Sequence, residues 1–120
     1  MAVTWDEVAA IAAQAGLLAA IDLPERRVWV GQYGDVAWER PLSKKDLKAL
    51  AGNAPVGDVL ALRTAGLVEK ARILVKHVDS CFDSLHFKSY PAILIDLGRV
   101  TRQELLALFI EAANLPPGGR

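Results

Sequence analysis

Apolar side chains recur every three or four residues in three stretches of the chain, which is typical of amphipathic helices. The first stretch follows Thr4-Trp5-Asp6-Glu7 and ends at Gly16, and the last follows Thr101-Arg102-Gln103-Glu104. Both quartets are capping boxes, which begin helices. The middle stretch contains a single apolar stripe, which we expect to face the core: Leu67, Ala71, Leu74, Val75 and Val78.

Other segments have the patterns of strands and turns. Val28 to Val30 and Val36 to Trp38 flank a glycine-containing loop, which predicts a β-hairpin. The continuous apolar run from Val59 to Leu62 predicts a strand buried on both faces. Two further strands are expected over Cys81 to Phe87 and Ala92 to Leu97, and a short helical turn over Leu17 to Leu23.

A further short helix is expected to begin at Ser43-Lys44-Lys45-Asp46 and to run to about Leu50. The order of elements is then helix, hairpin, short helix, strand, helix, hairpin and helix. This order predicts a single α+β domain over residues 1–115 with a largely antiparallel sheet, followed by a flexible tail over 116–120.

Composition narrows the class of protein. The chain has 120 residues, of which 52% are hydrophobic, enough for one domain with a filled core. No apolar run approaches the roughly 18 residues of a membrane span, the N-terminus has no signal-peptide pattern, and there is one cysteine. We therefore expect a cytoplasmic protein that does not bind a membrane.

The charges balance. The chain has fourteen Lys and Arg residues and fourteen Asp and Glu residues, which gives a formal net charge of zero. Dedicated nucleic-acid binders usually carry a positive excess, so any such binding here must use a local patch. Neutrality also weakens the repulsion between copies, which makes self-association more plausible, and we expect a monomer or a weak homodimer.

The residues that could support catalysis are poorly spaced for it. Cys81 and His86 would lie about 16 Å apart on opposite faces of one predicted strand, which is incompatible with a nucleophile–base pair. His77, Asp79, Asp83 and His86 do not have the spacing of a metal site. The chain also lacks a glycine-rich phosphate loop. We therefore expect a non-enzymatic protein with no cofactor.

Basic residues gather around the predicted short helix and the strand that precedes it. Such a cluster could contact phosphates, with the hairpin tip beside it acting as a wing, although a solvated helix face is the alternative. The candidate nucleic-acid-binding residues are Arg40, Lys44, Lys45, Lys48, Arg26, Arg27 and Tyr33.

Aromatic residues suggest a second candidate site. Trp29, Trp38 and Tyr90 could wall a small pocket, to which His86 and Arg63 would add polar contacts. The alternative is that the tryptophans fill the core.

Three motifs resemble the YjbR/MmcQ-like family of small bacterial proteins. They are Ala37-Trp38-Glu39-Arg40-Pro41-Leu42 with Asp46-Leu47, then Glu69-Lys70, and finally His86-Phe87-Lys88-Ser89-Tyr90-Pro91. The resemblance covers roughly Thr4 to Leu115 and implies a compact α+β fold similar to a double-wing DNA-binding domain. It implies double-stranded DNA as the partner. A module that binds a small molecule or a protein through Trp38, His86 and Tyr90 remains the alternative.

Overall fold

The computed structural model describes residues 2–22, 26–32, 34–50, 52, 54–84 and 87–114. Tyr33 and His86, which the sequence nominated as site residues, lie outside these ranges. The described elements, in chain order, are α1 (Trp5–Gln14), β1 (Leu18–Asp22), β2 (Arg26–Gly31), β3 (Gly34–Glu39), α2 (Lys44–Leu50), β4 (Val59–Arg63), α3 (Leu67–Lys76), β5 (Cys81–Phe82), β6 (Ala92–Asp96) and α4 (Arg102–Ala113).

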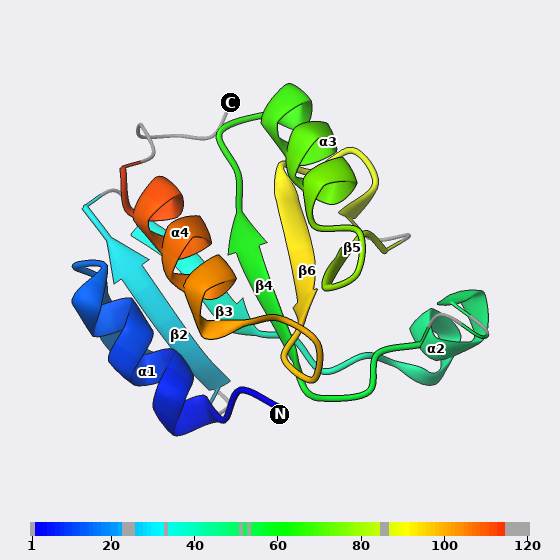
Figure 1. Ribbon diagram of the computed structural model, residues 1–120, viewed down its shortest axis with the longest axis horizontal. Coiled ribbons are helices and arrows are strands. Elements are labelled where there is room, and N and C mark those ends of the chain that lie inside the picture. The colour runs from blue at the N-terminus through cyan, green and yellow to red at the C-terminus, as the bar shows by residue number, and fades with distance from the viewer. Residues whose placement is uncertain are drawn as a thin grey trace.

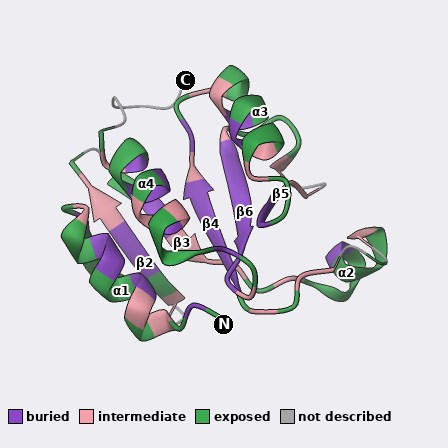
Figure 2. Ribbon diagram, viewed as in Figure 1, coloured by how far each residue is buried: buried purple, intermediate pink, exposed green. Residues whose placement is uncertain are grey.

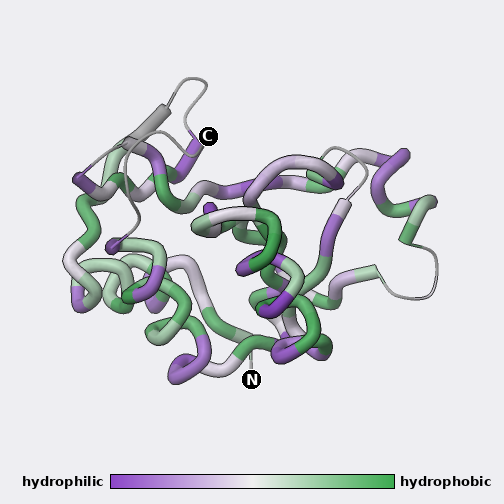
Figure 3. The backbone as a smooth tube through the Cα atoms, turned by 90° about the horizontal axis from the view of Figure 1, so that it is seen from above, coloured by the Kyte–Doolittle hydropathy of each residue, from purple (hydrophilic) through white to green (hydrophobic). Residues whose placement is uncertain are grey.

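The strands form one six-stranded sheet in the order β1-β2-β3-β4-β6-β5, and each neighbouring pair is antiparallel. Helices α1, α3 and α4 lie on one side of this sheet (Figures 1 and 3), whereas α2 projects from the edge of the molecule. The predicted single α+β domain with an antiparallel sheet is confirmed. None of the helices in the described ranges is long and apolar enough to cross a membrane.

The core lies between the sheet and the three helices. Leu60 and Leu62 of β4 and Ile93 and Ile95 of β6 are buried against Phe109 and its neighbours on α4. Strands β4 and β6 are buried along almost their whole length (Figure 2), because short segments also cover their other face. The predicted doubly buried strand at Val59 to Leu62 is therefore confirmed, and its unbroken apolar run follows from cover on both sides.

All three predicted helix starts are confirmed. Thr4 and Glu7 form a capping box, as do Thr101 and Glu104. At α2, Asp46 accepts hydrogen bonds from the N–H and the hydroxyl of Ser43, and its own N–H donates to the Ser43 oxygen. Each box satisfies N–H groups that the first turn of a helix leaves without partners.

One helix prediction and one strand prediction are wrong. Leu17 to Leu23 was expected to form a helical turn but includes β1, which pairs with β2 across the first hairpin. Gly16 reverses the chain there with a φ of 90°, so the segment returns beside the sheet and does not extend the helix. The strand expected to reach Phe87 ends at Phe82, and the next residue, Asp83, pairs with Lys70 of α3.

The rotation of α3 also differs from the prediction: Leu74 of the predicted stripe packs against the core, but most of the stripe does not. The buried residues of the helix are Lys70 and Ile73, while Leu67, Val75 and Val78 from the predicted core stripe are exposed. A local attachment of Lys70, described below, fixes the helix in this rotation.

The capping boxes of α1 and α4 predict how the stability of the folded state depends on pH. Hydrogen bonds from Thr4 N–H and from Arg102 hold the pKa of Glu7 below its ordinary 4.5. Burial tends to raise the pKa of Glu104, but hydrogen bonds from Thr101 and His77 outweigh it, so this pKa is also lowered. The folded state therefore binds fewer protons than the unfolded chain when the pH is near 4.5.

We expect the melting temperature to hold above that pH and to fall as the pH drops from about 5 toward 3, where these carboxylates become protonated. Thermal unfolding followed by circular dichroism across this range measures the effect. Glu104→Gln should flatten the slope, while Glu111→Gln, on an exposed carboxylate outside both boxes, should not. Equal slopes for both variants and the parent protein would show that the Glu104 box makes no contribution.

Candidate functional site

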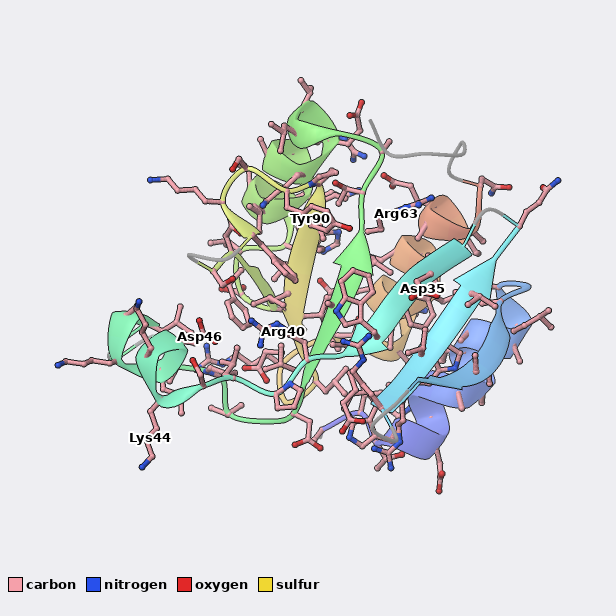
Figure 4. All side chains as sticks on the ribbon, turned by 180° about the vertical axis from the view of Figure 1, so that it is seen from behind. Asp35, Arg40, Lys44, Asp46, Arg63 and Tyr90 are labelled. Atoms are coloured by element: carbon pink, nitrogen blue, oxygen red, sulfur yellow. The ribbon has the colours of Figure 1, made fainter. Side chains whose placement is uncertain are left out.

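Helix α2 presents only positive charge to its surroundings. Lys44, Lys45 and Lys48 are exposed, whereas its single acid, Asp46, is 3% exposed and turned inward. Asp46 points inward because it caps the helix through Ser43. A depression of about 290 Å³ separates the helix from the segment that follows β5, and Lys44 extends outward from the helix (Figure 4).

Arg40 connects α2 to the rest of the domain. Its guanidinium lies 5.7 Å from the centroid of the Phe87 ring and 3.8 Å from Asp46, and it donates a 2.7 Å hydrogen bond to the Pro41 carbonyl. Arg40 is thus engaged within the protein, whereas the three lysines extend away from it. The predicted basic cluster therefore divides into one anchoring arginine and three accessible lysines.

The face of the sheet opposite α1, α3 and α4, here called the open face, carries a row of paired residues. Leu42, Phe82 and Phe87 cover this row at β4 and β6. Val28, Trp38, Ala61 and Leu94 lie side by side on four adjacent strands in the observed register. Side chains alternate between faces along a strand, so Arg26 and Arg63, two residues from this row on β2 and β4, lie on the same face. Figure 4 shows Arg40, Arg63 and Tyr90 from this side.

Aromatic rings form a connected cluster over this row. Phe87 lies between Trp38 and Tyr90, with ring centroids 6.3 Å and 5.6 Å away, and it also receives the guanidinium of Arg40. Trp38 and Phe87 are partly buried against the small apolar cluster beneath them, while Tyr90 is 46% exposed. Trp38, Arg63 and Tyr90, from the second predicted site, therefore share a face with Arg26 and Arg40 from the first.

Two predicted site residues lie on the opposite side of the sheet. Arg27 stacks over Trp5 at 5.1 Å and binds Glu39 at 3.2 Å, close to the start of α1. Trp29 stacks on Trp5 with centroids 6.2 Å apart and is buried in the main core. The idea that Trp29 walls a pocket with Tyr90 is therefore wrong, because alternation along β2 turns it away from Trp38.

Lys70 of α3 holds the aromatic segment in place, a role that the sequence did not suggest. The residue is 4% exposed, and its amine donates to the carbonyl oxygens of Phe87 and of Tyr90, the latter at 2.8 Å. It also lies 3.0 Å from the carboxylate of Asp83. The contacts of the Lys70 amine with these three oxygens hold the turn that carries Phe87 and Tyr90. This turn stands where a strand was expected beyond Phe82. The sequence signal for this role was the Glu69-Lys70 motif, which marked the position but not the partners of the lysine.

The side chains considered for catalysis have other partners. Burial raises the pKa of the Cys81 thiol to about 12, so the thiolate needed for nucleophilic attack does not form near neutral pH. Nδ1 of His77 lies 2.8 Å from Glu104, and Asp83 is bound to Lys70. In the described part of the chain, no three His, Cys, Asp or Glu side chains are grouped so that they could hold a metal ion.

Comparison with known proteins places the chain among mycobacterial relatives. The uncharacterized protein Rv2570 of Mycobacterium tuberculosis and the uncharacterized protein Mb2600 of Mycobacterium bovis are each 36% identical to it over 113 residues. Each match covers 91% of this chain and 84% of the relative. No family model and no solved structure matches the chain. At this identity and coverage, the chain belongs to the same family as these two mycobacterial proteins.

Proposed function

We propose that this protein binds DNA through α2 and the adjacent open face of the sheet. The observation that carries the proposal is that the only acid of α2 is buried, so that all of its exposed charges are those of lysines. A surface of this kind contacts phosphates without reading sequence. Because the whole chain is neutral, the expected affinity is modest and depends on salt.

The open face would add contacts beside the lysines. Arg26 and Arg63 lie on this face, and Tyr90 is exposed enough to stack against a base or a sugar. Arg40 would act by positioning, because its contacts with Asp46 and Phe87 connect α2 to the aromatic cluster.

The resemblance to YjbR/MmcQ-like proteins supports the same proposal. Its three separate motifs meet at one place: Arg40 packs on Phe87, and Lys70 binds the carbonyls of Phe87 and Tyr90. These contacts would hold α2 at a fixed position relative to the aromatic cluster. This arrangement is what a shared binding surface requires.

Fluorescence anisotropy with labelled DNA tests the proposal. The apparent association constant should fall as salt is raised, and each lysine that contacts a phosphate should contribute about 0.9 to the slope of log K against log salt. Lys44→Ala/Lys45→Ala/Lys48→Ala is therefore expected to reduce that slope by about 2.7. Each of the three single substitutions should reduce it by about 0.9. Lys76→Ala, which removes an exposed lysine from α3, is the matched control for these single variants and should leave the slope unchanged.

Duplex and single-stranded probes of the same length separate two modes of contact. A stronger effect of Tyr90→Ala on the single strand would indicate stacking at the aromatic cluster. Absence of binding to either probe at low salt would refute the proposal. The aromatic cluster with its exposed Tyr90 would then remain as the alternative, a site for a small molecule or a protein whose binding does not depend on salt.

A further inference from the structure

Helix α3 directs an apolar face away from the domain. With 3.6 residues per turn, residues separated by three, four or seven positions lie on one side of a helix. The exposed members of this side include Leu67 (52% exposed), Val68 (78%), Val75 (79%) and, just after the helix, Val78 (72%). Together with the exposed Ala71 they form a contiguous surface, here called the α3 apolar face.

The fold cannot bury this face by rotating the helix. Turning α3 inward would withdraw the Lys70 amine from the carbonyls of Phe87 and Tyr90 and from Asp83. Ile73 would leave the core at the same time. A contiguous apolar patch that the domain holds outward in this way is typical of an interaction surface.

We propose that the α3 apolar face pairs with the same face of a second copy of the chain. Val68 and Val78 lie at equal distances along the chain from Ile73, and so do Ala71 and Val75. When two α3 helices pack antiparallel about a twofold axis that passes the outward side of the helix at the level of Ile73, Val68 meets Val78 of the second copy, and Ala71 meets its Val75. Each of these four residues then faces an apolar residue of the second copy, as the apolar part of a twofold interface requires, while Leu67 lies opposite Asp79 at the edge of the contact.

Two further observations favour a second copy. The formal net charge is zero, so two copies do not repel one another as wholes. The small side chain of Ala71 near the middle of the face also lets the helices approach closely. Five small and medium-sized residues cover less than the roughly 800 Å² that each partner contributes to a standard interface. The dimer is therefore expected to be weak and reversible, with a dissociation constant in the micromolar range.

Sedimentation velocity of the full chain over a range of concentrations, without DNA, tests this proposal. The parent protein should shift from monomer to dimer as its concentration rises. Val75→Lys should weaken dimerisation about tenfold or more, because it buries a charge at the twofold interface. Leu18→Lys is the matched control, since Leu18 is 70% exposed but lies on strand β1. It should leave the monomer–dimer equilibrium unchanged, and circular dichroism should show that both variants fold.

Disulfide trapping tests the antiparallel arrangement. A mixture of Ala71→Cys and Val75→Cys proteins carrying tags of different size should form the mixed disulfide-linked dimer more than either self-linked dimer. The native Cys81 is buried, so it should not contribute. A protein that stays monomeric at all concentrations would overturn the proposal. The face would then be covered by another part of the chain or by another protein. A dimer that survives Val75→Lys, or a mixture that forms no preferred mixed disulfide, would overturn it as well.

Discussion

Replacing Lys70 with methionine is expected to lower the free energy of unfolding by about 4 kcal/mol. Methionine fills a similar volume but cannot donate hydrogen bonds. The carbonyls of Phe87 and Tyr90 would lose a donor, and the Asp83 carboxylate would lose its ion pair. The cost is large because Lys70 itself is almost completely buried, so water cannot readily replace the missing amine.

Chemical denaturation followed by circular dichroism measures this loss, and hydrogen exchange locates it. The amides of residues 87–90 should exchange faster in Lys70→Met than in the parent protein, because the turn loses its attachment to α3. Lys76→Met, on an exposed position of the same helix, should change the free energy of unfolding by less than about 0.5 kcal/mol. If the two variants lost the same small amount, the buried amine would not be an important anchor of this turn.

Replacing Asp96 with alanine is expected to cost about 3 kcal/mol. Asp96 is 1% exposed, and its carboxylate accepts hydrogen bonds from the N–H groups of Val56 (3.0 Å), Gly57 (3.0 Å) and Gly98 (2.8 Å). Gly57 and Gly98 are in close contact, and a Cβ on Gly57 would lie 2.6 Å from the nitrogen of Gly98. This contact brings N–H groups from two distant loops to one carboxylate.

Denaturation of Asp96→Ala and Asp96→Asn separates the contributions. Asparagine keeps one acceptor oxygen and loses the charge, so its effect should lie between those of aspartate and alanine. Asp79→Ala, on an exposed acid, serves as the control and should be nearly neutral. A nearly neutral Asp96→Ala would mean that water satisfies these N–H groups once the carboxylate is gone.

For the candidate site, the sequence predicted which residues are polar or aromatic but not which of them meet. Trp38, Arg63 and Tyr90 were assigned to one site and Arg26 and Arg40 to another, yet all of them lie on or beside the open face. The reason is that β2, β3 and β4 are adjacent in the sheet, and their register is set by tertiary pairing. Arg27 differs from Arg26 by one position and therefore lies on the opposite face.

The sequence by itself determined the features that depend on neighbouring residues. The capping boxes at Thr4, Ser43 and Thr101 began helices, because their hydrogen bonds join residues only three positions apart. The apolar run of β4 likewise indicated a strand buried on both faces. The same local pattern failed for α3, where amphipathicity revealed an apolar face but not what covers it. Only the tertiary structure decided that Lys70 points inward, because its oxygen partners lie 13 to 20 residues further along the chain.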